Sequence, residues 1–163
     1  MSDFEAAALN DAVFPNTFRS GCLFHLGQCI FRRIQRFPQH FARYNADDGF
    51  KSSLRSLQAL AFVPLPYVYN YFCILASSLE PTNEMRELLL YFVNTWIGPQ
   101  HIVENEELIV DENAGQAADG WIRGQIEAMN LQHANALFPM PIWNTCDRLA
   151  EGMGRTNNSV EVK

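Results

Sequence analysis

Cysteine and histidine are the first residues whose spacing suggests chemistry. Two residues separate Cys22 from His25, and three more separate His25 from Cys29. A structural zinc site needs four such ligands, usually arranged as two spaced pairs. The remaining histidines stand far apart in the sequence: His40, His101 and His133. Because no second pair follows, the pattern favours Cys22 as a small buried residue at a strand end and His25 as a polar group at a helix start.

Basic residues are the second group that could bind a ligand. Residues 1–60 hold seven of the twelve basic residues against five acidic ones, whereas residues 61–163 hold five basic and thirteen acidic residues. We therefore expect any DNA contact to involve Arg32, Arg33 and Arg36 in the first third. The alternative, that these arginines only form the solvated face of helices, has equal support, because the net charge is −6. The wider basic set comprises Arg32, Arg33, Arg36, Arg43, Lys51 and Arg55.

The composition is that of one packed domain. Of the 163 residues, 48% are hydrophobic and 12% are aromatic, which is enough for a core and argues against disorder. The four cysteines form no Cys-x-x-Cys pair, so we expect reduced thiols in an intracellular protein. No apolar run approaches the roughly 18 residues needed to span a membrane. A phosphate-binding glycine loop and a nucleophile elbow are also missing, which disfavours a kinase or hydrolase.

The elements that would position these residues are mostly helical. Residues 17–24 are predicted as a short strand, and residues 25–37 as a helix that Pro38 stops. Between 47 and 98 the pattern predicts three further helices, the first capped by Asp47 or Asp48 and the third by Thr82. Their expected inward positions are Phe50, Leu54, Leu57 and Ala61, then Val68, Phe72, Leu75 and Leu79, then Met85, Leu88, Leu89, Phe92 and Trp96.

The second half of the chain begins with an acidic segment. Residues 101–120 are predicted as a loosely structured acidic insert. Helical spacing returns in 121–137 through Ile122, Ile126 and Met129, and 142–153 is expected to form a short helix. Trp96 and Trp143 are expected in the core.

Several local sequences, in this order, resemble the catalytic domain of Mutator-like (MULE) transposases. Gly21-Cys22-Leu23-Phe24-His25-Leu26 is similar to the Cys-x-x-His signature of that family. Other similar blocks are Ser2-Asp3-Phe4-Glu5 with Val13-Phe14-Pro15, Leu57-Gln58-Ala59-Leu60-Ala61-Phe62-Val63-Pro64, Phe92 to Gly98, Ile142-Trp143-Asn144, and Arg155-Thr156-Asn157-Asn158-Ser159-Val160-Glu161.

This resemblance implies an α/β or α+β fold, a partial RNase H-like core with a large helical insertion. The implied divisions are a core part at 1–40, the helical insertion at 41–100, an acidic insert and helix at 101–137, and at 138–163 a segment that leads to the last catalytic residue. Asp3 matches the second catalytic carboxylate and Glu161 the third. In the family such carboxylates hold Mg²⁺, which stabilises the attacking and leaving oxygens at phosphorus.

No residue of this chain matches the first carboxylate of the family, which lies well upstream of the position of Asp3. The resemblance therefore implies a transposase fragment or relic that is inactive alone and binds no Mg²⁺ tightly, with DNA as its partner and the nucleus as its location. Two alternatives stay open. One is a DNA-associated regulatory protein that uses the basic residues without catalysis, and the other is a helical protein-interaction module. Self-association through the incomplete sheet is a further expectation.

Overall fold

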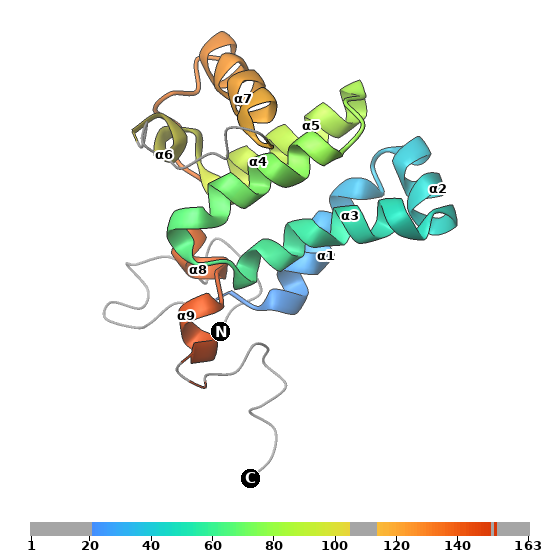
Figure 1. The fold of residues 1–163 in the computed structure, drawn as a ribbon, viewed down its shortest axis with the longest axis horizontal. Coiled ribbons are helices and arrows are strands. Elements are labelled where there is room, and N and C mark those ends of the chain that lie inside the picture. The colour runs from blue at the N-terminus through green and yellow to red at the C-terminus, as the bar shows by residue number, and fades with distance from the viewer. Residues whose placement is uncertain (1–20, 105–113, 151, 153–163) are drawn as a thin grey trace.

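The structure, a computed structural model, describes residues 21–104, 114–150 and 152 (Figure 1). Regular structure in these ranges is helical. The α-helices are α1 (Leu23–Ile34), α2 (Pro38–Ala46), α3 (Asp48–Ala59), α4 (Val68–Ser78), α5 (Asn83–Phe92), α6 (Pro99–Glu104), α7 (Gln116–Ala128), α8 (Met140–Trp143) and α9 (Cys146–Ala150). Two 3₁₀ turns, η1 (Leu60–Phe62) and η2 (Leu65–Tyr67), connect α3 to α4, and a π-helical turn, η3 (Val93–Ile97), extends α5.

The expected α/β or α+β fold with a partial RNase H-like core is wrong. The described ranges contain no sheet, and their strand-like feature is an isolated bridge at Gly21, whose N–H donates to the Ile142 carbonyl over 2.7 Å. The strand predicted at 17–24 is also wrong where it can be checked, because Leu23 and Phe24 belong to α1. The helical stripe that starts at Leu26 extends backwards by one turn, since a short apolar run fits a helix as well as a strand.

Pro38 begins a helix that the sequence pattern did not predict. The first helix ends at Ile34, and Pro38 then occupies the first position of α2. A proline there loses no hydrogen bond, because the first N–H groups of a helix have no partner within it. The same reasoning applies to Pro99, which follows Gly98 and opens α6. Both prolines therefore separate helices and also start the next one.

The predicted helices of residues 47–98 are confirmed. The Asp47 carboxylate caps α3 by accepting a hydrogen bond from the Phe50 N–H over 3.0 Å, and the Thr82 hydroxyl accepts from the Met85 N–H over 3.1 Å at the start of α5. Such caps satisfy N–H groups that the helix itself leaves open. The predicted inward residues are buried, except Leu75, which is half-buried.

Two tryptophans join the last helices to this bundle, as their predicted core positions require. The Trp143 indole N–H of α8 donates to the Trp96 carbonyl in η3 over 2.7 Å. The ring of Trp143 packs edge-on against Phe92 with 6.1 Å between centroids, and Phe92 stacks on Phe72 at 5.4 Å. The short helix expected within 142–153 is present as two pieces, α8 and α9, of which α8 begins slightly earlier.

The expectation of a loose acidic insert is wrong at both of its described ends. Residues 99–104 form α6 with Ile102 buried, and α7 already begins at Gln116; residues 105–113 lie outside the described part. Arg123 of α7 connects these two helices, because its side chain donates to the Ile102 carbonyl of α6 over 3.0 Å. It also pairs with Asp119 within α7 over 2.9 Å. The helical spacing predicted to continue through Met129 ends earlier, because α7 stops at Ala128 and Met129 is exposed.

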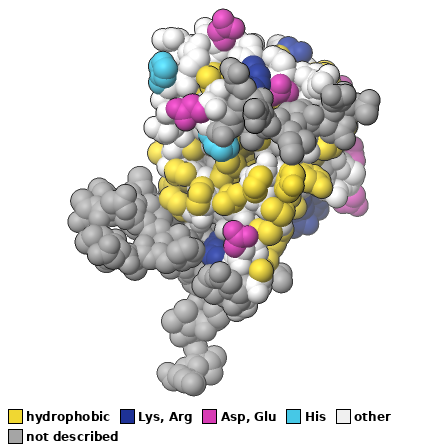
Figure 2. All heavy atoms as spheres, turned by 60° about the vertical axis from the view of Figure 1, so that its left-hand side comes forward, with side chains coloured by type: hydrophobic (Ala, Val, Ile, Leu, Met, Phe, Trp, Pro, Cys, Tyr) yellow, Lys and Arg dark blue, Asp and Glu magenta, His cyan; other side chains and the backbone are white. Residues whose placement is uncertain are grey.

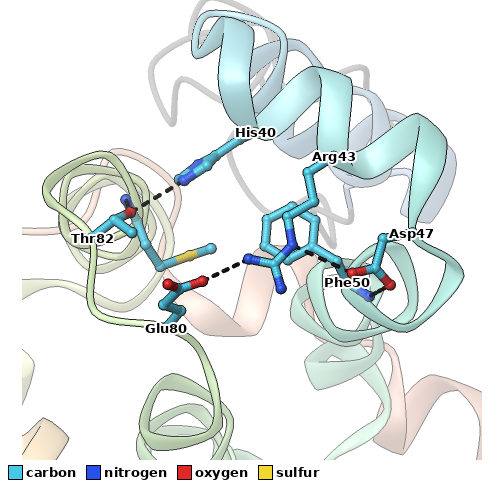
Figure 3. A network of polar contacts seen from close by, with 7 residues as sticks. His40, Arg43, Asp47, Phe50, Glu80 and Thr82 are labelled. Atoms are coloured by element: carbon cyan, nitrogen blue, oxygen red, sulfur yellow. Dashed lines mark hydrogen bonds and ion pairs between the residues drawn. The ribbon is translucent and has the colours of Figure 1, made fainter.

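Polar contacts hold α2 against its neighbours (Figure 3). Arg43 of α2 pairs with Glu80, before α5, over 2.7 Å, and its guanidinium lies 4.4 Å from the ring centroid of Phe50 in α3. The buried His40 ring lies 3.3 Å from the Thr82 hydroxyl through Nε2. One short helix is thereby fixed to both α3 and the start of α5.

Two exposed glycines in the middle of α7 predict a gain in stability on substitution. A Cβ added at Gly120 or Gly124 would meet nothing within 4 Å. Glycine in a helix interior costs roughly 0.5–1 kcal/mol relative to alanine. We therefore expect Gly120→Ala and Gly124→Ala each to raise the free energy of unfolding by about that amount, measured by urea denaturation.

Gly98→Ala is the matched control for this measurement. Gly98 has φ +99°, and a Cβ there would lie 2.9 Å from the Ala136 backbone nitrogen. This variant should lose stability. If Gly120→Ala and Gly124→Ala also lose stability, these two positions are not open sites in the interior of a helix.

His40 predicts a pH dependence of stability. Burial lowers the pKa of His40, while nearby Glu84 and Glu80 raise it in part and Arg43 lowers it further. The unfolded chain therefore binds this proton more readily than the folded protein does. The stability that neutral His40 contributes to the fold is fully present above the unfolded pKa of about 6.5, and it is lost as the pH falls through and below that value.

His40→Gln removes this titration and keeps a polar side chain near Thr82. Urea denaturation between pH 7.5 and 5.5 should show a steeper loss of stability for the natural protein than for His40→Gln. The other histidines are common to both proteins, so their contributions cancel in the comparison. Parallel curves would show that His40 is not held neutral by the fold.

Candidate functional site

The carboxylates implied by the transposase resemblance lie outside the described residues. Asp3 and Glu161 belong to the ranges 1–20 and 153–163. Within the described part, His, Cys, Asp and Glu side chains form no group of three that could hold a metal ion. The Mg²⁺ site at Asp3 and Glu161 therefore stays a prediction.

Cys22 and His25 stand at the beginning of α1. Cys22 is the N-cap residue, it is buried as a free thiol, and its carbonyl accepts the first helical hydrogen bond from the Leu26 N–H over 3.0 Å. His25 is half-buried and packs edge-on against Phe24, with ring centroids 5.3 Å apart. The two residues thus help to start and pack a helix.

Arg33 is engaged within the fold. Its guanidinium pairs with Glu87 of α5 over 2.8 Å, and it lies 4.9 Å from the ring centroid of Tyr91 and 5.5 Å from that of Phe37. An arginine held between aromatic rings and a carboxylate is positioned to join two helices. Arg33 is therefore a connection between α1 and α5 and is poorly placed to bind DNA.

Arg32 and Arg36 differ from Arg33. Both are exposed, and neither forms an ion pair with any residue that the structure describes. Arg43 resembles Arg33 because Glu80 and Asp47 neutralise it. The basic set of the first third is thus divided between cations that stabilise the fold and cations that remain available.

A groove lies between α1 and α3 in the described part of the chain. Its volume is about 430 Å³, within the range of roughly 300–1,000 Å³ found for ligand sites. The lining residues are Phe24, Gly27, Gln28, Ile30, Phe31 and Ile34 of α1, Tyr44 of α2, and Lys51, Leu54, Arg55 and Gln58 of α3.

Gly27 lets the two walls of the groove approach each other. A Cβ at this position would lie 2.7 Å from the amide of Gln58, closer than atoms tolerate. The Gln58 side chain crosses from α3 to α1, where its Nε2 donates to the Leu23 carbonyl over 2.9 Å. The absence of a side chain at Gly27 thus leaves room for the Gln58 amide, which connects α3 to α1 at this end.

Aromatic rings form the other end of the groove. Phe31 contacts Tyr44 at 5.4 Å and Phe41 at 6.0 Å between ring centroids. The ammonium group of Lys51 lies 5.8 Å from the Tyr44 ring centroid. Because the network in Figure 3 holds α2 in place, this end is built before any ligand arrives.

The charged side chains that line the groove are both cationic. Lys51 and Arg55 are one helical turn apart on α3. Lys51 lies 4.0 Å from Asp48, whose carboxylate is fully exposed, and Arg55 has no ion-pair partner among the described residues. The groove therefore combines an apolar floor with a positive wall.

A second hydrophobic surface lies elsewhere. Figure 2 shows a band of hydrophobic side chains on the face that is to the left in Figure 1. The connection from α3 and the start of α4 expose Phe62, Tyr67 and Tyr71, none of which lines the groove.

The buried polar cluster between α4 and α7 is structural. The Tyr69 hydroxyl donates to the Asp119 carboxylate over 2.8 Å. Burial raises the pKa of the Cys73 thiol to about 12 and also raises the pKa of Tyr69. Because the thiolate is the nucleophilic form, a cysteine with so high a pKa is unreactive at neutral pH.

The sequence contained a signal for the groove that the helix predictions did not use. Phe24, Gln28 and Phe31 repeat at helical spacing on α1, outside the stripe that faces the core. Assigning Phe24 to a strand separated it from the other two. Lys51 and Arg55 were recognised as basic, but their position beside an apolar floor depends on the contact between α1 and α3.

No helix within the described ranges is long and apolar enough to cross a membrane. Comparison of the chain with protein-family models, with curated proteins and with solved structures gave no match.

Proposed function

We propose that this chain is a helical protein-interaction module and that the groove between α1 and α3 is its binding surface. The observation that carries this proposal is an exposed aromatic side chain beside an apolar floor. Phe24 is 57% exposed at the edge of the groove, whereas Ile30 and Leu54 beneath it are almost completely buried. Exposed aromatics next to a concave apolar surface are typical anchors of protein interfaces.

Preorganisation also supports binding at this place. Gln58 bridges the walls at one end, and Phe31 packs on Tyr44 at the other. A surface that is already ordered loses little conformational entropy when a ligand binds. The groove is thus better suited to binding than the connection between α3 and α4, where side chains such as Tyr67 are exposed.

The transposase function implied by the resemblance has weaker support. It needs a sheet that brings distant carboxylates together, and the fold expected for that purpose is wrong in the described residues. Asp3, Glu161 and a nuclear location remain predictions. DNA association is the second candidate, because Arg32 and Arg36 are exposed and have no described ion pair.

A displayed library of amphipathic helices tests the proposal. The library should yield ligands for the natural chain, and their affinity should fall about tenfold on Phe24→Ala, the usual cost of removing an aromatic anchor. Tyr71→Ala is the matched control, since Tyr71 is 52% exposed and lies outside the groove. This control should bind like the natural chain. A library without ligands, or ligands that depend on Tyr71 and not on Phe24, would contradict the proposal.

A further inference from the structure

We propose that the ligand of this groove is an acidic amphipathic helix, whose apolar face covers the groove floor and whose carboxylates pair with Lys51 and Arg55. This inference rests on the proposed function and specifies the chemistry of the partner. It is carried by the geometry and the charges of the two walls.

The walls favour a helix over an extended segment. The floor is made by Gly27, Ile30 and Leu54, which offer no polar side chain to a ligand. An extended backbone laid on these three residues would leave its N–H and C=O groups there without partners, because none of them has a polar side chain. A helix satisfies its own backbone and presents side chains to a groove at regular spacing.

The spacing of the lining residues supports the same ligand. Phe24, Gln28 and Phe31 rise along α1 at steps of about one turn, and Lys51 and Arg55 do so along α3. A third helix between two such ridges can insert its own side chains between theirs. The partner would then complete a three-helix arrangement with α1 and α3.

The charges of the α3 wall require an acidic partner. Lys51 and Arg55 face the groove, and no carboxylate lines it within the described part of the chain. Other described arginines are already neutralised within the fold, as Arg33 is by Glu87 and Arg123 by Asp119. Arg55 lacks such a partner, so a ligand carboxylate can neutralise it without breaking an existing pair.

The charge of the whole chain favours a protein ligand over DNA. The net charge is −6, so the positive groove is a local feature of an acidic protein. DNA binding gains most of its affinity from neutralising many phosphates along a broad basic surface. Two cations beside an apolar floor suit a ligand that has carboxylates on one edge and apolar side chains on the other.

The experiment compares a selected helical ligand with a copy in which each Glu and Asp is changed to Gln or Asn. Affinity for the natural chain is measured by fluorescence anisotropy at about 0.05 M and about 0.5 M salt. We expect the neutral copy to bind at least about fivefold more weakly at low salt, and high salt to reduce this difference. Lys51→Gln and Arg55→Gln should weaken the acidic ligand and leave the neutral copy nearly unchanged.

Arg36→Gln is the matched control, because Arg36 is also exposed without a described ion pair but does not line the groove. It should leave both affinities unchanged. If the two ligands bind equally and the affinity of both depends on Phe24, the groove binds protein, but the proposal that its ligand is acidic is wrong. If neither depends on Phe24, the proposed function itself is wrong. Labelled duplex DNA that binds more tightly than the acidic ligand, and less tightly to Arg55→Gln, would overturn the inference in favour of a nucleic-acid surface.

Discussion

Aromatic rings from successive helices contact one another in series through the core, and the other elements are attached to this series. The order of contact is Tyr69, Phe72, Phe92, Trp143, Trp96 and Phe138, with 5.0–6.5 Å between neighbouring ring centroids. The rings unite α4, α5, η3 and α8, so that residues far apart in the sequence share one core. Both ends of the series also carry polar connections, since the Tyr69 hydroxyl donates to Asp119 of α7 and the Phe138 N–H donates to the Thr95 carbonyl in η3. A bundle fixed in this way supports α3, and α1 packs on α3.

The groove follows from how α1 is placed on α3. Leu26, Ile30 and Ile34 enter the common core, while Arg33 connects the other side of α1 to α5. The remaining stripe of α1 is left beside α3, where Gly27 leaves room for the Gln58 amide that connects the two helices. The site is therefore a product of packing: the same contacts that stabilise the bundle hold its aromatic and cationic walls apart. Its positive charge comes from Arg55, which no described carboxylate neutralises, and from Lys51, which lies 4.0 Å from the fully exposed Asp48 carboxylate.

The sequence predicts the part of this fold that depends on local patterns. The caps at Asp47 and Thr82 and the apolar stripes of α3–α5 were predicted because hydrogen bonding and helical period are both encoded within a few residues. The apolar run at Leu23 and Phe24 is too short to distinguish a strand from a helix, and a resemblance in short motifs led to the wrong fold class. Pro38 was read as a stop although it also starts a helix. The roles of Arg33 and Arg55 could not be separated by sequence, because they depend on which of them meets a carboxylate from a distant helix.

The groove can bind a partner as proposed only if α1 and α3 form a rigid, preformed pair. Amide hydrogen exchange along the full natural chain, without any ligand, measures this directly, because protected amides report the free energy of local opening. We expect the amides of residues 27–34 in α1 to exchange as slowly as those of residues 54–58 in α3, since both segments belong to one core. Fast exchange throughout α1 beside a protected α3 would contradict this expectation, because the groove would then lack one of its walls before any partner binds.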